Sequence, residues 1–234
     1  MEKRNNSVYF TFGRFNPPHR GHGELIKYVI DLAGSHSDYY IIVSSTQNKT
    51  WINSKVFNAQ KEAGDYESLK TNENPLNVSQ KMKYLHKMYP GVKFIEAYGN
   101  NIVKTVENMK ELGYTDITGV FGEDREESFK KAFKGSINIL GLPRSSPISA
   151  TKLRKAAVKN EIDYFTEQTK SGNMSEADSL ELMKEVRKEL WNEFGKTKNY
   201  LNKNYLNKNY LNKNYLNKNY LIRCNRDIKY LKSI

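Results

Sequence analysis

The segment from Val8 to Ala33 constrains the fold of this 234-residue sequence more than any other. An apolar run from Val8 to Phe12 has the character of a buried strand. Gly13 interrupts the run, and the Pro-Pro pair that follows forces an extended turn that continues neither a strand nor a helix. Apolar residues at helical spacing then follow from Glu24 to Ala33. The segment predicts a strand, a Gly/Pro loop and a helix in succession.

Two histidines, His19 and His22, lie where that predicted helix begins. The amides and the dipole of a helix N-terminus favour an anion, and Gly21 lets the backbone approach a phosphate closely. A zinc site needs further ligands, but the other two histidines lie in unrelated segments and the single cysteine is Cys224. The pattern therefore predicts a site for nucleotide phosphates and no metal site. The simpler alternative is a pair of solvent-exposed histidines.

The net charge of +12 suggests a nucleic-acid partner, but this charge is unevenly distributed. Residues 196–234 contain ten lysines and arginines and one acid, which leaves the first 195 residues at +3. From Tyr200 the unit Tyr-Leu-Asn-Lys-Asn repeats four times, and a period of five matches neither a helix nor a strand. We expect a basic repeat tail that is disordered or marginally helical. The alternative is an arm that contacts nucleic acid through charge and stacking.

The sequence contains no apolar run long enough to cross a membrane. Its N-terminal residues lead into the first predicted strand without the pattern of a signal peptide. A single cysteine excludes a disulfide framework and is typical of a reducing compartment. We therefore expect a cytoplasmic protein with no membrane partner.

Predicted strands and helices alternate along the first 195 residues. The expected strands cover residues 8–12, 38–45, 92–95, 117–121 and 137–140. The expected helices cover residues 24–33, 77–88, 101–112 and 126–133, followed by one that Ser149 caps and one from Ser175 to about residue 194. This order predicts an α/β fold with a Rossmann-like, doubly wound parallel sheet of five strands, C-terminal helices and a low-complexity tail.

A polar run follows the second predicted strand. Ligands of an open parallel sheet bind beyond the carboxyl ends of its strands, so this run is a candidate wall of a binding pocket. An ordinary polar loop is an equally good interpretation. The candidate residues for binding an acceptor substrate are Ser45, Thr46, Gln47 and Asn48.

A second cluster of hydroxyls and cations lies between Ser146 and Arg154. Ser149 is placed to cap a helix, so free amides would lie at that helix start, with Lys152 and Arg154 in its first turns. Alone, the cluster is a capped basic helix, which is a common feature. Combined with the histidine loop in one α/β unit, it predicts a second phosphate-binding helix start.

These two motifs resemble those of the HxGH nucleotidyltransferase superfamily, the cytidylyltransferase-like enzymes. The stretch Phe12–His22 is similar to the signature GxFxPxHxGH, and Ile148–Arg154 is similar to the signature ISxTxxR. The Gly-Arg-Phe opening resembles nicotinamide-mononucleotide adenylyltransferases, as well as phage and giant-virus nucleotidyltransferases, which would act in a host cytoplasm. The resemblance implies a nucleotidyltransferase domain over residues 1–195, followed by the tail at 196–234. Residues 50–74 have no counterpart in it, and we expect an insertion or mobile loop there that could act as a lid.

The resemblance also implies roles for individual residues. The triphosphate of a nucleotide would lie over the histidine loop, and the second motif would hold its β and γ phosphates. The implied catalytic residues are His19, His22, Lys152 and Arg154. The implied nucleotide-binding residues are Phe12, Gly13, Arg14, Phe15, Gly21, Gly122, Asp124, Ile148, Ser149 and Thr151.

The implied reaction moves a nucleoside monophosphate from a nucleoside triphosphate, by expectation ATP, onto a phosphorylated acceptor and releases pyrophosphate. Nicotinamide mononucleotide is the leading acceptor. Mg²⁺ is the expected cofactor, held mostly by phosphates and water because the motifs contain no carboxylate cage. The alternatives are a cytidylyltransferase that acts on a phosphorylated alcohol, and a nucleotide-binding module without turnover whose tail binds nucleic acid.

Overall fold

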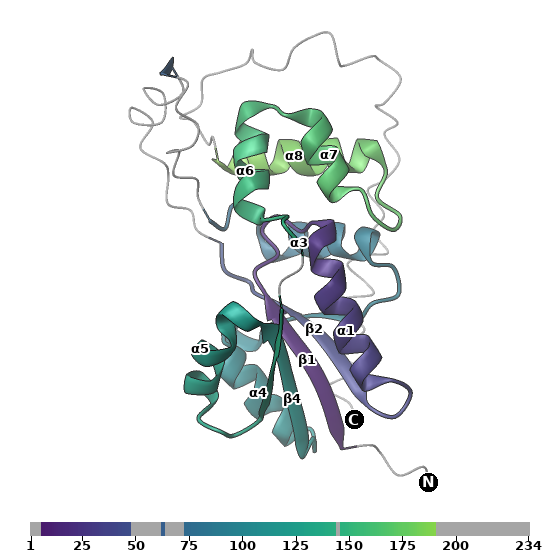
Figure 1. The fold of residues 1–234 in the computed structure, drawn as a ribbon, viewed down its shortest axis with the longest axis vertical. Coiled ribbons are helices and arrows are strands. Elements are labelled where there is room, and N and C mark those ends of the chain that lie inside the picture. Colours follow the sequence, from purple (N-terminus) through teal and green to yellow (C-terminus); the bar gives the residue numbers. More distant parts are fainter. Residues whose placement is uncertain (1–5, 48–61, 64–72, 144–145, 191–234) are drawn as a thin grey trace. The chain divides into compact units, whose positions relative to one another are not determined.

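Apolar and aromatic segments of the chain form one parallel sheet, shown in Figure 1. The computed structural model describes residues 6–47, 62–63, 73–143 and 146–190. The strands are β1 (Ser7–Gly13), β2 (Asp38–Val43), β3 (Phe94–Glu96), β4 (Asp116–Gly122) and β5 (Asn138–Leu142). The sheet has five strands in the order β3-β2-β1-β4-β5, and every pairing is parallel. The predicted α/β fold class is confirmed.

Helices connect the strands and continue after the last one. They are α1 (Gly23–Ala33), α3 (Val78–Met88), α4 (Ile102–Glu111), α5 (Glu123–Phe133), α6 (Ala150–Lys159), α7 (Ile162–Thr169) and α8 (Glu176–Leu190). Side chains cap several of the helix starts. Asn77 and Gln80 form a reciprocal capping box at α3, and Asn101 accepts hydrogen bonds from two amides of α4. These caps explain why the helices begin where they do.

Strand β1 occupies the centre of the sheet, between β2 and β4. Its register pairs Gly13 with Val43 of β2, so both strands end at the same edge. The order of the strands reverses on the two sides of β1, which makes its carboxyl end the switch point where α/β sheets bind ligands. The loop after Gly13 therefore begins at the position where a ligand site is expected.

The period of two along the strands sends alternate side chains to opposite faces of the sheet. Phe10 and Phe121 lie on the face covered by α4 and α5, where Val106 and Phe129 join them in one buried cluster. Tyr9, Ile41 and Val120 lie on the other face, where α1 and α3 pack. Helices therefore cover both faces, which explains why the strands are apolar on both sides.

The three C-terminal helices pack on α3 instead of on the sheet, and Figure 1 shows them as a group beyond its carboxyl edge. Leu153 of α6, Phe165 of α7 and Leu182 of α8 share a buried cluster with Tyr84 of α3. Because α3 also packs on the sheet, it connects the helical group to the sheet.

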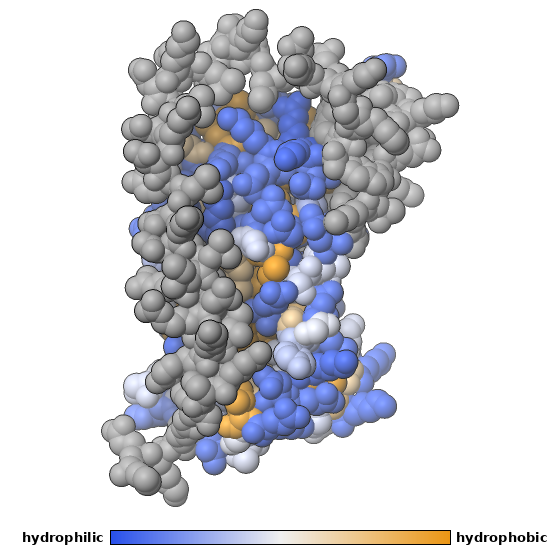
Figure 2. Space-filling view, turned by 180° about the vertical axis from the view of Figure 1, so that it is seen from behind, coloured by the Kyte–Doolittle hydropathy of each residue, from blue (hydrophilic) through white to orange (hydrophobic). Residues whose placement is uncertain are grey.

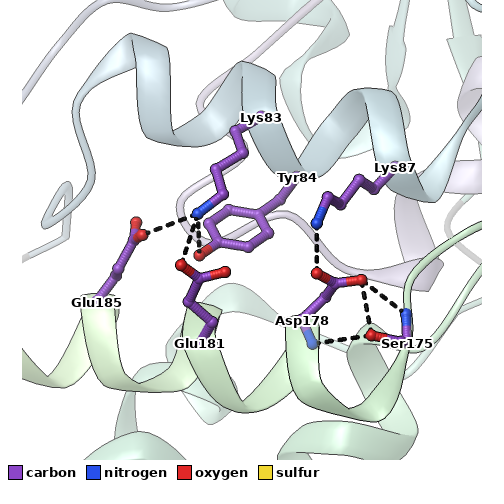
Figure 3. A network of polar contacts seen from close by, with 7 residues as sticks. All are labelled: Lys83, Tyr84, Lys87, Ser175, Asp178, Glu181 and Glu185. Atoms are coloured by element: carbon purple, nitrogen blue, oxygen red, sulfur yellow. Dashed lines mark hydrogen bonds and ion pairs between the residues drawn. The ribbon is translucent and has the colours of Figure 1, made fainter. Parts of the chain in front are cut away.

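Ion pairs fasten α8 to α3 beside that apolar cluster (Figure 3). Lys83 pairs with Glu181 at 3.0 Å and with Glu185 at 3.3 Å. Lys87 pairs with Asp178, which also accepts hydrogen bonds from the amide and the hydroxyl of Ser175, at 3.0 and 2.8 Å. Burial opposes the charge of Asp178, but these hydrogen bonds outweigh that effect and lower the pKa of its carboxyl.

Element boundaries differ slightly from those that the sequence predicts. Strand β3 covers Phe94–Glu96 instead of residues 92–95, because only its later residues pair with β2. Helix α5 begins at Glu123, three residues before its expected start, with acids in its first turn. The repeat tail at 196–234 lies outside the described residues, as do Asn48 and most of the expected insertion at 50–74. The predictions for these segments remain predictions.

The surface of the described residues is mostly hydrophilic on the face that Figure 2 shows, with apolar side chains in small scattered patches. The large apolar side chains that are exposed are few among the described residues, and Tyr98, at 63%, is the most exposed. In the part of the chain that the structure describes, no helix combines the length and the apolar character needed to span a bilayer.

The α3–α8 ion pairs predict an acid-sensitive loss of stability. We expect Asp178→Asn to lower the free energy of unfolding at neutral pH by about 1–2 kcal/mol, because the variant loses charge-assisted hydrogen bonds. The pKa of Asp178 lies below its unfolded value of 3.8. The difference from the wild type is therefore fully present above that pH and disappears as the pH falls through the lower, folded value. Urea denaturation from pH 7 to pH 2 measures it.

The matched control is Asp163→Asn, which removes an exposed acid from the first turn of α7. This control should change stability by less than about 0.5 kcal/mol. Equal effects of the two variants at neutral pH would contradict the role of the α3–α8 contact.

Candidate active site

The loop between β1 and α1 is built around a tightly placed aromatic ring. A Cβ atom on Gly13 would lie 2.6 Å from the ring of Phe15, so only glycine fits there. Phe15 itself has a φ of 47° and is 4% exposed. Its ring packs edge-on against that of His22, with a centroid distance of 4.7 Å. The Gly-Arg-Phe sequence thus creates the surface that orients the second histidine.

The two motif histidines stack on each other, with ring centroids 3.7 Å apart and 23° between the ring planes. The backbone amide of His19 lies 3.1 Å from Nδ1 of His22 and donates to it. Where Nδ1 accepts this hydrogen bond, the proton of the neutral ring lies on Nε2. The same Nδ1 also lies 3.0 Å from the backbone carbonyl of His19, to which a protonated Nδ1 would donate, so the two contacts require different tautomers of His22. The carbonyl of His19 accepts from the hydroxyl of Tyr89 at 2.8 Å, which fixes the loop from the side of α3.

Gly21 lies against both motifs. A Cβ atom at this position would lie 2.6 Å from Oγ of Ser146 and 3.1 Å from the ring of His19. The absence of a side chain therefore lets the histidine loop approach the segment that precedes α6. The two clusters that the sequence predicts to act together lie next to each other.

Asn16 and Arg154 connect the two motifs directly. The guanidinium of Arg154 donates to the backbone carbonyl of Asn16 at 2.8 Å and to the hydroxyl of Thr151 at 3.0 Å. The side-chain amide of Asn16 donates to the carbonyl of Leu76 and accepts from its amide, both at 2.9 Å. Residues separated by 60 and 138 positions in the sequence are therefore joined at one buried point.

The two cations of the second motif, Lys152 and Arg154, differ in burial on helix α6. Ser149 caps the helix by accepting from the amide of Lys152 at 3.2 Å, as predicted. Arg154 is 6% exposed, whereas Lys152 is an exposed residue. A step of two residues along a helix rotates the side chain by about 200°, so the two leave opposite sides of α6. The geometry brings the Arg154 guanidinium to the histidine loop, whereas Lys152 is an exposed residue in the first turn of α6 and its predicted role remains a prediction.

Two further arginines follow the carboxyl ends of β1 and β4, at the same edge of the sheet as the histidine loop. Arg14 pairs with Glu73 at 2.6 Å, and both side chains are more than half exposed. Arg125, in the first turn of α5, packs its guanidinium over the ring of Phe129 at 4.8 Å. Burial and the nearby charge of Arg14 lower the pKa of Arg125, and Asp124 opposes this shift.

Burial lowers the pKa of Arg154 to about 10, with Glu73 raising it and Arg14 lowering it further. At neutral pH the guanidinium is still charged. The positive charge of Arg14 therefore repels those of both Arg125 and Arg154. Cations that repel one another are stabilised by a shared anion, so this arrangement favours a polyanionic ligand.

The polar run after β2 forms a hydrogen-bonded group with the turn after β3. The hydroxyl of Ser44 donates to that of Thr46 at 2.9 Å, and Nδ2 of Asn100 donates to the same Thr46 hydroxyl at 3.0 Å. Gln47 donates to the carbonyl of Pro75 at 3.0 Å. The predicted acceptor wall is therefore an ordered surface from Ser44 to Gln47, with Ser45 half-buried within it.

The remaining predicted residues surround these groups. Phe12 packs edge-on against Phe129. The carboxylate of Asp124 lies over Gly122, where a Cβ atom would be 2.6 Å from Oδ1. Ile148 is buried beneath the start of α6. Across the described residues, no group of three or more His, Cys, Asp or Glu side chains is placed to hold a metal ion.

Four residues of this region received no role from sequence reasoning: Asn16, Lys81, Asn100 and Arg125. Asn16 lies inside the first motif, so its position was a usable signal. Arg125 follows the carboxyl end of β4 directly, which also points to the ligand edge. Lys81 and Asn100 lie in a lysine-rich helix and a polar turn, and nothing in their local sequence distinguishes them.

A parallel sheet with an anion-binding loop after its central strand and a second cationic helix start defines a nucleotide-binding α/β protein. A family model described as cytidylyltransferase-like matches residues 10–156, and the chain belongs to that family. Membership supports nucleotidyl transfer as the class of activity.

Among solved structures, the chain is similar to a Plasmodium falciparum nicotinic acid mononucleotide adenylyltransferase complexed with NaAD. The identity is 10%, the TM-score is 0.38, and the match covers 68% of this chain and 89% of that one. A search of the curated proteins gives no match.

The link between Asn16 and Leu76 predicts a large effect on stability. Asn16→Ala would leave a buried amide and a buried carbonyl without their partners, and we expect it to lower the free energy of unfolding by about 2–4 kcal/mol. Urea denaturation measures the change. The control is Asn138→Ala, because the exposed amide of Asn138 donates to Asp116 at 3.2 Å and should contribute less than about 1 kcal/mol. A variant Asn16→Ala as stable as this control would show that the link does not hold the loop.

Proposed function

We propose that this protein is a nucleotidyltransferase that moves AMP from ATP onto a phosphorylated acceptor and releases pyrophosphate. The observation that carries the proposal is the contact between Arg154 and Asn16, which brings the helix starts of both motifs together. Two helix N-termini, the histidine pair and the neighbouring arginines then surround one region at the switch point of the sheet. A triphosphate matches the positive charge of this arrangement.

The proposed chemistry needs no protein nucleophile. A phosphate oxygen of the acceptor, already anionic, attacks the α-phosphorus of ATP. The bond between the α-phosphorus and the bridging oxygen breaks, and pyrophosphate leaves with its electron pair. The enzyme therefore contributes positioning and neutralisation of charge, as is typical of phosphoryl-group chemistry.

His22 is the proposed donor to the transferring group. In the tautomer in which its Nδ1 accepts from the amide of His19, the proton lies on Nε2 and is available to a phosphate oxygen. His19, stacked on it and buried, fixes the ring and adds a second imidazole to the site. Arg154 stabilises the leaving pyrophosphate, assisted by the amides near Ser149 and Thr151.

Mg²⁺ remains the expected cofactor. The donor set of the described residues fits an ion that arrives with the nucleotide rather than one held in a protein cage, because no cluster of three metal-binding side chains is present there. When bound, such an ion would neutralise charge on the phosphates.

We infer ATP as the donor and nicotinamide mononucleotide as the acceptor from the resemblance of the Gly-Arg-Phe opening to nicotinamide-mononucleotide adenylyltransferases. A panel of nucleoside triphosphates and phosphorylated acceptors, with pyrophosphate release as the signal, tests both choices. Turnover only with CTP and a phosphorylated alcohol would favour a cytidylyltransferase. Binding of ATP without turnover of any acceptor would favour a nucleotide-binding module.

His22 gives the most direct prediction. We expect His22→Ala to reduce kcat for pyrophosphate release by about 10²–10³-fold, the usual effect of removing one donor to the transition state. His36→Ala is the matched control, because His36 is an exposed histidine in the turn before β2. Circular dichroism should show both variants folded. Full kcat in the His22 variant would contradict the proposed site.

Arg125 gives a second prediction. Its guanidinium lies at the start of α5, where the charge of Arg14 acts on it. If it faces the polyanion together with Arg14, Arg125→Ala should raise the Kd for ATP about tenfold, the loss of one charge-assisted contact. Arg187→Ala serves as the control, since Arg187 donates to Asn160 on the side of α8. Calorimetric titration with ATP compares them, and equal Kd values would remove Arg125 from the site.

A further inference from the structure

Lys81 is a buried lysine to which the proposed chemistry gives no task. It lies on the face of α3 that also buries Tyr84, Leu85 and Met88, at helical spacing. Its side chain is fully buried, with 0% exposed. Every other buried position on this face is apolar or aromatic, so an aliphatic side chain would fit the packing.

The ammonium of Lys81 has one hydrogen-bond acceptor among the contacts of the described residues, the backbone carbonyl of Ser44. Burial lowers the pKa of Lys81 to about 8, and Glu96 at the end of β3 opposes this shift. Burial of a charged group is unfavourable, and a single carbonyl compensates only part of that. The stability of the fold alone therefore does not explain why a lysine occupies this position.

Ser44 is the residue where the sheet ends and the predicted acceptor wall begins. Its amide still donates to the carbonyl of Gly13 at 2.9 Å, as a continuation of the β1–β2 pairing. Its hydroxyl already belongs to the group formed with Thr46 and Asn100. The carbonyl that Lys81 holds lies between these two sets of contacts, so it determines the direction in which the chain leaves the sheet.

We propose that Lys81 is a positioning residue that holds the segment Ser44–Gln47 in the arrangement that receives the acceptor. That this segment receives an acceptor rests on the proposed function, whereas the positioning role of Lys81 rests on the structure. Apart from the Ser44–Gly13 hydrogen bond of the sheet, the nucleotide clamp is held by contacts that do not involve Lys81, through Asn16, Arg154 and Tyr89. Loss of Lys81 should therefore affect the acceptor side and leave the nucleotide side unchanged.

The test uses Lys81→Met in the full chain, since methionine keeps the length of the buried side chain without its charge. Lys83→Met is the matched control: Lys83 lies on the same helix and its ion pairs with Glu181 and Glu185 are structural (Figure 3). Three quantities are measured for each variant: hydrogen exchange at Ser44–Gln47, the Kd for ATP alone, and the KM for nicotinamide mononucleotide or whichever acceptor the panel identifies.

For Lys81→Met we expect faster exchange at Ser44–Gln47, an ATP Kd within twofold of the wild type, and an acceptor KM about tenfold higher. Lys83→Met should leave all three quantities unchanged. Unchanged exchange and KM in Lys81→Met, or equal effects of the two variants, would overturn the positioning role.

An increase in the ATP Kd equal to that in the acceptor KM would also overturn it, because it would indicate general loosening of the fold. A wild-type protein that turns over no acceptor would refute the proposed function and the acceptor part of this inference together. The exchange difference would still decide, independently of turnover, whether Lys81 holds the segment.

Discussion

The contact between the Arg154 guanidinium and the Asn16 carbonyl is the interaction on which the rest of this site depends. One partner belongs to the loop after the first strand and the other to helix α6, 138 positions later in the sequence. Each helix start alone is a weak site for an anion, and this contact, together with the close approach of Gly21 to Ser146, joins them. Because it is buried and charge-assisted, it brings them together in a fixed geometry. The proposed triphosphate site thus depends on tertiary structure rather than on either motif alone.

Local sequence was enough to predict the strand, loop and helix of the first motif, the cap at Ser149 and the alternation that implies a parallel sheet. These features depend on glycine, proline and hydrophobic periodicity, which act over a few residues. The contacts of Asn16 with Leu76 and of Lys81 with Ser44 span 60 and 37 positions, and no local pattern reports them. Lys81 in particular resembles its neighbours Lys83 and Lys87 in sequence, although only Lys81 is fully buried.

Lys152 and Arg154 show that a motif written as a string of letters does not say how deeply each side chain is buried. Both are cations of the second motif, two residues apart, and the resemblance implied a shared task. Helical geometry turns one toward the histidine loop and the other toward solvent. Conversely, Arg125 enters the region because the helix after β4 starts at the same sheet edge, which is a property of the topology.

The ion pair between Arg14 and Glu73 means that Arg14 already has an anionic partner before any ligand binds. Glu73 already neutralises part of the positive potential around Arg14 and Arg154. A phosphate that contacted Arg14 in the proposed site would replace this carboxylate, and the gain would be the difference between two ion pairs rather than the whole of one. In the proposed site such an exchange would favour a multiply charged anion, because a singly charged one would offer Arg14 little that Glu73 does not already supply.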